Sequence, residues 1–312
     1  MKTQRIIGTD LEVSRVALGC MRMPEPAQAI AAARAAVDAG INFFDHANIY
    51  GRGRCETAFA SVWREMPGLR GKVIIQSKVG IRHAGDPNSG SPGRYDFSYE
   101  HIKESVDASL KRLDVDHLDI LLLHRPDALV EPEEVARAFD EIEQAGKVRY
   151  FGVSNHAGWQ IDLLKKHVRQ PLVVNQLEFS LLHMPLINAG SIVNQDTANY
   201  PTRGDGALDY CRLHDITVQA WSPLAHGIFG GSPADERAQK AIAAVATMAA
   251  AKGVAPETIL IAWLLRHPAK IQPIVGSTNP SRIAAAARAT EVELSREEWY
   301  TLFVAARDAN MP

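Results

Sequence analysis

The stretch Ile41-Asn42-Phe43-Phe44-Asp45-His46-Ala47-Asn48-Ile49-Tyr50-Gly51 changes from apolar to polar part-way along its length. Residues 41–44 form a short run typical of a buried strand. The polar residues behind it begin with an acid, Asp45, and reach Tyr50 one loop later. This arrangement places reactive side chains at the carboxyl end of a strand. Taken alone, it fits equally well an ordinary core strand followed by a solvated loop.

Seven other apolar runs of strand type occur along the chain, with helical patterns between them. We expect the eight strands at residues 16–18, 41–44, 73–76, 118–123, 148–153, 172–175, 216–220 and 271–275. Helices are expected at residues 27–39, 99–112, 132–145, 159–167, 206–214, 235–252 and 280–287, with two more at 256–266 and 295–307. This alternation predicts a (β/α)8 barrel that spans residues 1–312 as one domain, with extra helices near its C-terminus. Gly8-Thr9-Asp10 predicts a short N-terminal β-hairpin.

A doubly wound sheet is the competing architecture. It usually carries a glycine fingerprint after its first strand, and Gly51-Arg52-Gly53-Arg54-Cys55-Glu56 fails at the third glycine. Three polar segments, 80–97, 183–205 and 225–234, are too long for simple connections. The first and last follow strands three and seven, so in a barrel they would rise over the carboxyl-end face, where active sites lie.

Composition excludes several classes of function. A net charge of -2 gives no reason to expect nucleic acid or an anionic membrane as a partner. The 3 cysteines are far apart in the sequence, which fits a reducing compartment and offers no metal framework. The first residues lack the apolar region of a signal peptide, and the longest apolar run, 259–265, is too short to cross a bilayer. We expect a cytoplasmic protein that is monomeric by default.

Four residues of catalytic type follow neighbouring strands. Strand two delivers Asp45 and Tyr50, strand three delivers Lys78, and strand four delivers His124. Singly, Lys78 fits a loop lysine and His124 a buried structural histidine. Together they form a proton donor for a carbonyl group, because a lysine ammonium should lower the tyrosine pKa from about 10 and an acid should keep the lysine charged. His124 would orient the carbonyl oxygen. The hydride must come from elsewhere.

The sequence resembles the aldo-keto reductases, including the branch of the potassium-channel β-subunits. The likeness runs from about Thr9 to Trp299 and is most specific at residues 42–51, at Gly146-Lys147-Val148-Arg149-Tyr150-Phe151-Gly152-Val153-Ser154-Asn155 and at Trp221-Ser222-Pro223-Leu224. Members of this family are (β/α)8 barrels that reduce aldehydes and ketones with NADPH. The resemblance implies that Asp45, Tyr50, Lys78 and His124 form the catalytic tetrad, with Tyr50 as the general acid.

The resemblance also implies cofactor-binding positions. Ser154, Asn155 and Gln176 would hold the nicotinamide carboxamide, and Trp221 would stack on the nicotinamide ring. The pyrophosphate would lie along Ser222, Pro223, Leu224 and Gly227, and the adenosine 2′-phosphate at Gly276, Ser277, Thr278, Asn279 and Arg282. A hydroxyl-rich turn at a helix N-terminus with one arginine is an anion site on physical grounds as well. Gly276 stands where many relatives carry a lysine, so NADPH is expected and NADH is the alternative.

The substrate pocket and the function keep alternatives open. Met21, Met23, Tyr50, Phe97 and Trp221 fit the lining of an apolar cavity and equally well packing at the barrel mouth. The short segment after the last helix predicts an open, permissive site. The main expectation is a reductase of small carbonyl compounds. A second is a cofactor-binding redox sensor or regulatory subunit with little turnover. A third is a lyase that uses Lys78 as a Schiff-base nucleophile, which would need a lysine often free of its proton.

Overall fold

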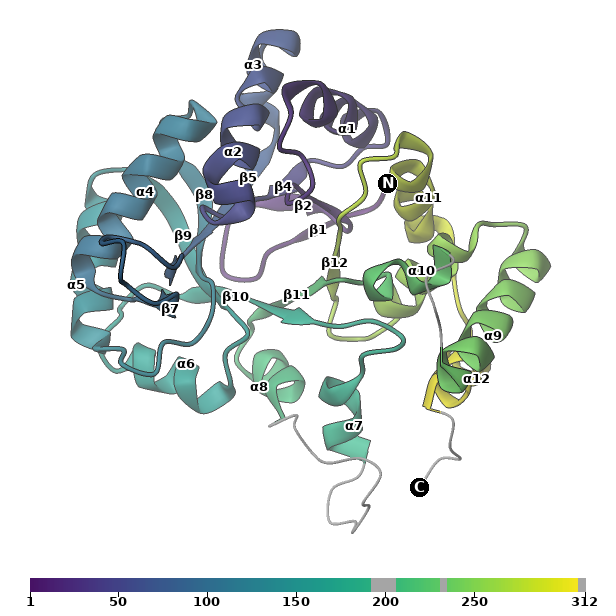
Figure 1. The fold of residues 1–312 in the computed structure, drawn as a ribbon. Coiled ribbons are helices and arrows are strands. Elements are labelled where there is room, and N and C mark those ends of the chain that lie inside the picture. The colour runs from purple at the N-terminus through teal and green to yellow at the C-terminus, as the bar shows by residue number, and fades with distance from the viewer. Residues whose placement is uncertain (192–205, 231–234, 308–312) are drawn as a thin grey trace.

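The computed structural model describes residues 1–191, 206–230 and 235–307 and forms a closed parallel barrel (Figure 1). Its strands are β3 (Ala17–Gly19), β4 (Phe43–Asp45), β5 (Ile74–Val79), β8 (Leu118–Leu123), β9 (Val148–Ser154), β10 (Leu172–Glu178), β11 (Thr217–Trp221) and β12 (Gln272–Val275). Each strand pairs with the next in this order, and β12 pairs with β3 to close the barrel. The predicted (β/α)8 fold is confirmed.

Helices surround this barrel in Figure 1. The predicted ones are α1 (Pro26–Asp38), α4 (Tyr99–Leu113), α5 (Pro132–Gln144), α6 (Gly158–Lys165), α8 (Ala207–Leu213), α9 (Glu236–Lys252), α10 (Pro256–Leu265), α11 (Pro280–Arg288) and α12 (Arg296–Arg307). No helix was predicted between β4 and β5, where the chain forms η1 (Tyr50–Gly53), α2 (Arg54–Phe59) and α3 (Ser61–Glu65). These helices are too short for a clear apolar period, and Gly51 and Arg52 interrupt the first with φ of 57°. Short 3-10 helices also occur at η2 (Arg70–Lys72) and η4 (Ala289–Glu291).

The three long polar segments contain regular structure of their own. Residues 80–97 include the short antiparallel pair β6 (Ile81–Arg82) and β7 (Arg94–Tyr95). The segment 183–205 begins with α7 (Pro185–Ser191), and the rest of this segment lies outside the described residues. The segment 225–234 begins with η3 (Ala225–Gly230), and 231–234 also lie outside them. The described parts of these segments therefore contain short strands and helices that the sequence did not predict.

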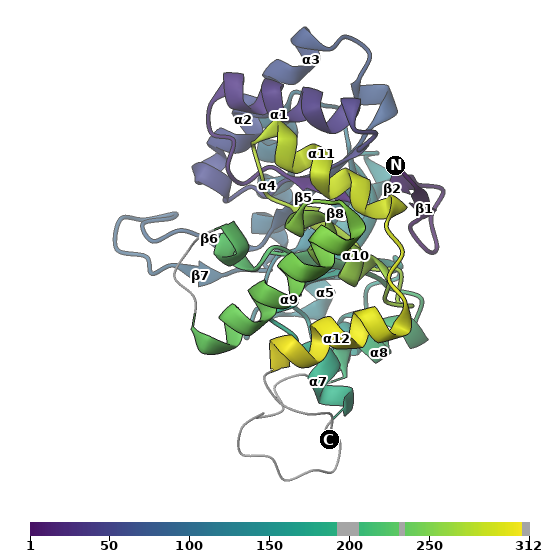
Figure 2. The ribbon, with the colours of Figure 1, turned by 90° about the vertical axis from the view of Figure 1, so that its right-hand side faces the viewer.

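The predicted N-terminal hairpin is formed by β1 (Thr3–Arg5) and β2 (Glu12–Ser14). In Figure 2 it lies at the opposite end of the barrel from β6 and β7. Ile6, Leu11 and Val13 of this segment pack, fully or almost fully buried, on barrel residues that include Phe43 and Ile120. The hairpin therefore closes the amino end of the barrel and leaves the carboxyl end for the site.

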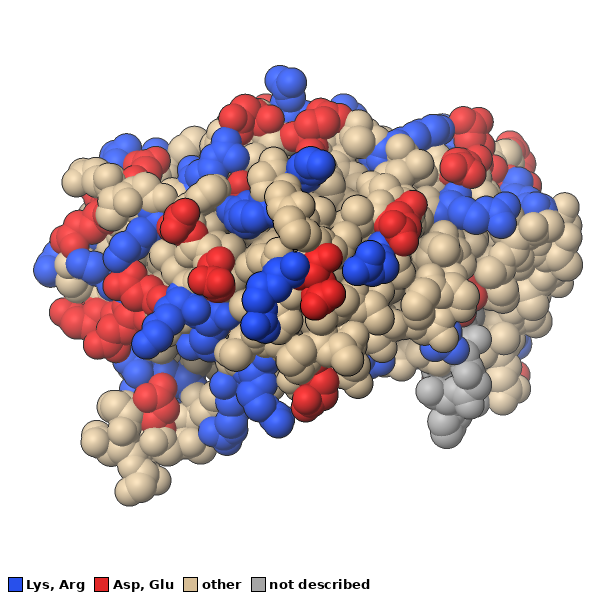
Figure 3. Space-filling view, turned by 90° about the horizontal axis from the view of Figure 1, so that it is seen from above, with Lys and Arg blue, Asp and Glu red and all other residues tan. Residues whose placement is uncertain are grey.

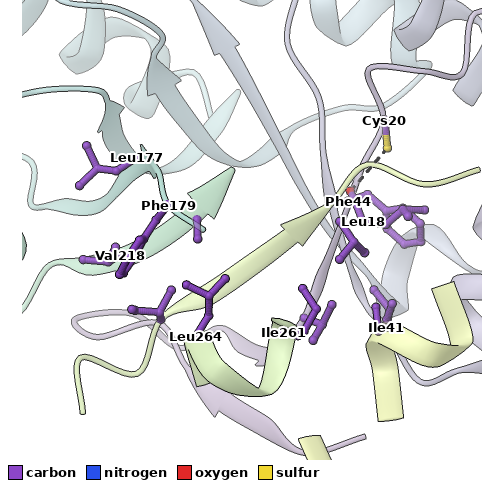
Figure 4. Close-up of a cluster of buried hydrophobic side chains, with 14 of the residues drawn as sticks. Leu18, Cys20, Ile41, Phe44, Leu177, Phe179, Val218, Ile261 and Leu264 are labelled. Atoms are coloured by element: carbon purple, nitrogen blue, oxygen red, sulfur yellow. Dashed lines mark hydrogen bonds between the residues drawn. The ribbon is translucent and has the colours of Figure 1, made fainter. Parts of the chain in front are cut away.

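The core has two parts, because alternate residues of each strand face opposite sides. Phe43 packs inside the barrel with the hairpin, whereas its neighbour Phe44 packs outside against the helices. Figure 4 shows this outer layer, in which Ile261 and Leu264 lie near the barrel strands. These two residues belong to α10, whose segment from Thr258 to Leu265 is buried throughout. Asp45 comes two residues after Phe43 and therefore faces the barrel interior.

The predictions about partners and location stay predictions. On the face shown in Figure 3, basic and acidic side chains of the described residues are interspersed rather than gathered by sign. In the described part of the chain no single helix has both the length and the apolar character to cross a membrane, and α9 with α10 meets that test only as a pair bent by 96°. The single-domain, monomeric and cytoplasmic expectations are not tested by these observations.

Candidate active site

A cavity of about 320 Å³ opens at the carboxyl ends of the barrel strands. Residues from every part of the predicted site line it: Asp45, Tyr50, His124, Ser154, Asn155, Gln176, Trp221, Ser222, Pro223, Leu224, Gly227, Gly276, Ser277 and Arg282. Gly19, Met21, Arg22, Arg125, His226 and Ile274 complete the lining. The structure therefore brings together residues that lie more than 230 positions apart, from Asp45 to Arg282.

Lys78 is the centre of the buried polar cluster beneath this cavity. Its Nζ lies 2.7 Å from both carboxylate oxygens of Asp45, 2.9 Å from the carbonyl oxygen of His46 and 3.1 Å from the Tyr50 hydroxyl. These three partners use all three N–H donors of an ammonium group. The side chain is 0% exposed and does not line the cavity itself. It therefore acts on the cavity through its contacts with Asp45 and Tyr50, which both line it.

Strand alternation explains why these groups converge. In β5, Gln76 and Lys78 face the barrel interior, while Ser77 points outward and donates to the buried Glu56 of α2 at 2.7 Å. Glu56 also accepts at 2.8 Å from Arg112 of α4. This outer cluster ties the strand of Lys78 to the helix that follows Tyr50, so the two residues are held from both sides of the sheet.

The pKa of Lys78 and that of Tyr50 are both raised. For Lys78, burial lowers the pKa. The charge of Asp45, the Tyr50 hydroxyl and the hydrogen bonds to both together raise it by more than burial lowers it. For Tyr50, burial raises the pKa more than the nearby ammonium of Lys78 lowers it. The expectation that Lys78 would bring the tyrosine pKa below its usual value is therefore wrong for the protein alone. Lys78 limits the rise that burial causes, and Tyr50 stays protonated at neutral pH.

His124 stands beside Tyr50, with ring centroids 6.0 Å apart and planes at 80°. Burial, and then the charges of Lys78 and Arg125, hold the pKa of His124 well below its usual range. The imidazole is therefore neutral at pH 7. Its Nδ1 is buried with no hydrogen-bond partner among the described residues. A neutral ring at this position can orient a carbonyl oxygen without adding charge.

A layer of glutamines inside the barrel was not anticipated from the sequence as a unit. Gln76 and Gln176 each donate to Asp45 Oδ1, at 2.7 and 3.1 Å, and to Gln219 Oε1, at 2.9 and 3.0 Å. Gln219 in turn donates to Gln272 at 2.9 Å. The layer therefore fixes the carboxylate that holds Lys78. Its only signal in the sequence is a glutamine at an inward position of four strands.

Ser154, Asn155 and Trp221 form a connected wall of the cavity. Asn155 donates to the Ser154 hydroxyl at 2.7 Å and to the His124 carbonyl oxygen at 3.3 Å. Its own Oδ1 accepts from the Trp221 ring nitrogen at 3.1 Å. Gln176, predicted beside them, lines the cavity but turns its amide nitrogen toward Asp45 and Gln219. These contacts fix the indole ring and link the wall to His124.

The segment after β11 approaches the cavity through an unusual backbone. Ser222, Ala225, His226 and Gly227 all have positive φ, between 48° and 86°. His226 Nε2 lies 3.0 Å from Glu178 Oε1 and its Nδ1 lies 3.3 Å from the Ser222 hydroxyl. Glu178 ends β10, so this contact joins the ends of two adjacent strands across the cavity edge.

The predicted anion site lies at the start of α11. Asn279 caps this helix, because its Oδ1 accepts from the backbone nitrogens of Ser281 and Arg282 at 2.9 and 3.4 Å. Ser277 and Arg282 line the cavity, whereas Thr278 and Asn279 do not. The Arg282 guanidinium lies 3.7 Å from Glu257 and is half exposed. The side chains left for an anion are therefore those of Ser277 and Arg282.

The chain matches the Aldo/keto reductase family over residues 15–303. It belongs to the aldo-keto reductases. It is 36% identical to the oxidoreductase YcsN of Bacillus subtilis, over 99% of this chain and 100% of that one. It is 38% identical to a 6-dehydroglucose reductase of Agrobacterium fabrum, over 97% and 98%. A probable voltage-gated potassium channel subunit beta of rice, Oryza sativa, is 28% identical over 85% and 82%.

This aldo-keto reductase is an NAD(P)H-dependent oxidoreductase, and its cavity fits such a cofactor. The lining runs from the proton-donor pair, Tyr50 and His124, to Ser277 and Arg282. Between these ends lie polar groups suited to an amide, Ser154 and Asn155, and an aromatic ring. Gly276 and Gly227 leave open space, since a Cβ on either would meet no atom within 4 Å. An elongated ligand with an amide at one end and phosphates at the other matches this donor set.

Two of the candidate pocket residues are packing residues instead. Met23 is 0% exposed and Phe97 is 2% exposed, so neither lines the cavity of this aldo-keto reductase. Phe97 instead stacks on His156 at 6.1 Å. Arg22, Arg125 and His226 were missed, although their positions next to Met21, His124 and Gly227 were signals that could have found them.

Proposed function

We propose that the protein reduces aldehydes or ketones to alcohols with NADPH, and that Tyr50 donates the proton. The observation that carries this proposal is the position of the Tyr50 hydroxyl. Tyr50 lines the cavity, and its hydroxyl lies 3.1 Å from the buried ammonium of Lys78. An O–H group that can leave its charge beside a fixed ammonium suits a carbonyl that is becoming an alkoxide.

Each residue of the cluster has a distinct task in this proposal. When bound, NADPH supplies the hydride to the carbonyl carbon. Tyr50 gives its proton to the carbonyl oxygen, and Lys78 stabilises the phenolate that remains. Asp45 keeps Lys78 charged and in place, with 2.7 Å to each oxygen. Neutral His124 orients the carbonyl oxygen against Tyr50.

The cofactor would lie along the lining already described. Ser154, Asn155 and Gln176 would hold the carboxamide, Trp221 would stack on the nicotinamide, and the pyrophosphate would lie along Ser222, Pro223, Leu224 and Gly227. Arg282 would bind the 2′-phosphate, which supports NADPH over NADH. Glu257, 3.7 Å from Arg282, would lose this partner on binding and weaken the preference. The lyase alternative is disfavoured, because all three donors of Lys78 are occupied and its pKa is raised.

The names of two relatives favour polar aldehydes as the substrate class of this protein. These relatives, from Agrobacterium fabrum and Novosphingobium aromaticivorans, are named 6-dehydroglucose reductase, at 38% and 36% identity. A glucose oxidised at its sixth carbon is an aldehyde on a small polar molecule. We carry over the chemical class and not that particular sugar.

Oxidation of NADPH in the presence of an aromatic aldehyde and of a small polar aldehyde such as glyceraldehyde tests this function. Changing Tyr50 to Phe removes the proton donor and should lower kcat by roughly 100- to 10,000-fold. Quenching of tryptophan fluorescence by NADPH should remain, because the rest of the lining is intact. A Tyr50→Phe protein that keeps its rate would contradict the role of Tyr50. Tight NADPH binding with no turnover in the unmodified protein would favour the redox sensor instead.

A further inference from the structure

Arg125 lines the cavity at its reacting end. It follows His124 directly, and consecutive Cα atoms are about 3.8 Å apart. Its guanidinium carbon lies 5.5 Å from the centre of the Trp221 ring. Arg282, the arginine of the predicted anion site, belongs to α11 at the opposite end of the lining. Arg125 is therefore close to the groups that act on the carbonyl and not to the phosphate end.

The charge of Arg125 has no counter-ion within the described part of the protein. Among the charged residues of the lining, Asp45 is paired with Lys78 at 2.7 Å and Arg282 with Glu257 at 3.7 Å, whereas neither Arg22 nor Arg125 has an ion pair with a described residue. No ion pair or hydrogen bond of the described residues involves the Arg125 side chain, and its guanidinium lies against the Trp221 ring. A partly buried guanidinium without a carboxylate loses hydration and gains little in return. A ligand can supply the missing charge.

We propose that Arg125 is a specificity residue that binds a carboxylate on the substrate, so that the preferred substrates are aldehydes bearing a carboxylate. The proposal rests on the proposed reductase function. A guanidinium presents two parallel N–H donors that match the two oxygens of a carboxylate. The Trp221 ring holds this fork by a cation–π contact while leaving its N–H edge free.

The lining favours a carboxylate over a phosphate. Arg125 brings one positive charge to the reacting end, where Lys78 is neutralised by Asp45 and His124 is uncharged at neutral pH. A carboxylate carries one negative charge, whereas a phosphate ester carries nearly two. A single guanidinium therefore balances the carboxylate fully. Arg22 also lines the cavity, but its side chain is exposed and already hydrated.

The test compares 4-oxobutanoate with its methyl ester, which is similar in size and lacks the charge. The unmodified protein should show a kcat/KM at least roughly 10-fold higher for the acid. In Arg125→Gln this acid-to-ester ratio should fall by roughly 10- to 100-fold, through the KM of the acid. Arg125→Lys keeps the charge without the fork and should restore part of the ratio. The affinity for NADPH, measured by fluorescence quenching, should stay within about twofold of the unmodified value.

Arg22→Gln is the matched control, because it removes the same charge from the lining of the same cavity. Its acid-to-ester ratio should change by less than about 3-fold, since an exposed arginine acts only through a screened field. A larger loss in Arg22→Gln than in Arg125→Gln would overturn the assignment. So would an Arg125→Gln protein that loses NADPH affinity instead of the acid preference, since Arg125 would then serve the cofactor.

Other outcomes separate this proposal from the proposed function. Reduction of the ester with no preference for the acid would leave the reductase function intact and overturn the role of Arg125. A preference for glyceraldehyde 3-phosphate over glyceraldehyde, with no preference for 4-oxobutanoate over its methyl ester, would show that the site binds a phosphate. That result would also overturn the proposed role of Arg125. If no aldehyde is reduced, the reductase function fails, and binding decides the rest. An anion site would still be supported if 4-hydroxybutanoate quenches the tryptophan fluorescence of the unmodified protein and butanol does not. The quenching by 4-hydroxybutanoate should then disappear in Arg125→Gln.

Discussion

Single residues in this site act through charges that are paired inside the barrel. Lys78 and Asp45 are both almost fully buried, and each is the counter-ion of the other at 2.7 Å. The Tyr50 hydroxyl sits on the same ammonium at 3.1 Å. Removing one charge therefore leaves the other buried without a partner, which costs far more than the pair contributes.

A double-variant cycle on this pair should show that coupling. Asp45→Asn should lower the free energy of unfolding by about 3–5 kcal/mol, because it leaves the ammonium of Lys78 unpaired in the interior. The double variant Asp45→Asn with Lys78→Met should recover part of this loss, since no charge remains unpaired. Denaturant unfolding measures all the proteins. A loss of stability in the double variant that equals the sum of the losses in Asp45→Asn and Lys78→Met would show that the two charges are not coupled.

At the scale of elements, the strands place the site only because their neighbours approach closely. β9 lies between β8 and β10 and ends at Ser154, which lines the cavity. Its Gly152 faces both neighbours, since a Cβ there would come within 2.7 Å of Leu122 Cδ2 and of the Val174 carbonyl oxygen. A glycine at this position lets the three strands reach their spacing.

Gly152→Ala should therefore strain the barrel wall beside the site. One of the two contacts is backbone and cannot rotate away, so the variant should lose about 1–3 kcal/mol of stability. The KM for NADPH should rise as well, because Ser154 lies two residues along the same strand. Gly71→Ala is the matched control, since a Cβ at Gly71 meets nothing within 4 Å. Equal stability of the two variants by calorimetry would argue against close packing at Gly152.

At the scale of the whole molecule, buried neutral histidines make folding sensitive to acid. Burial lowers the pKa of His46 to about 3 and that of His156 to about 4, from 6.5. Both nitrogens of His46 lack a hydrogen-bond partner among the described residues. A folded pKa below the unfolded value means that only the unfolded chain takes up these protons between pH 6.5 and about 3 or 4. Stability is therefore present in full above pH 6.5 and is lost as the pH falls below it.

Replacing His46 should remove part of this acid sensitivity. Each such histidine contributes a slope of about 1.4 kcal/mol per pH unit within its window, or about 2 kcal/mol between pH 6.5 and 5. His46→Leu is close in volume and does not titrate, so its stability should fall less steeply from pH 6.5 to 5. The exposed His214→Leu is the matched control for the loss of a histidine from the surface. Unfolding free energies measured across this range decide the point, and identical slopes in all three proteins would contradict it.

The barrel and the strand ends that carry the site could be predicted from chain order and periodicity. Periodicity is local, so eight apolar runs with helices between them are enough to predict the closed sheet. Asp45, Tyr50 and His124 could be assigned to the carboxyl ends because that position depends on chain order alone. The helices α2 and α3 escaped prediction because each is shorter than two turns and has no apolar period.

The interactions among the site residues could not be predicted, because they depend on contacts between distant parts of the folded chain. Gln76 meets Gln219 across 143 positions and Gln176 meets Asp45 across 131, pairings that no local pattern encodes. The direction of the Tyr50 pKa depends on burial, which outweighs the ammonium that the sequence identified. The lack of a carboxylate partner for Arg125 among the described residues is likewise a property of the folded chain that no local pattern encodes. Chain order determines where a side chain begins, whereas its partners depend on contacts that closure of the barrel creates.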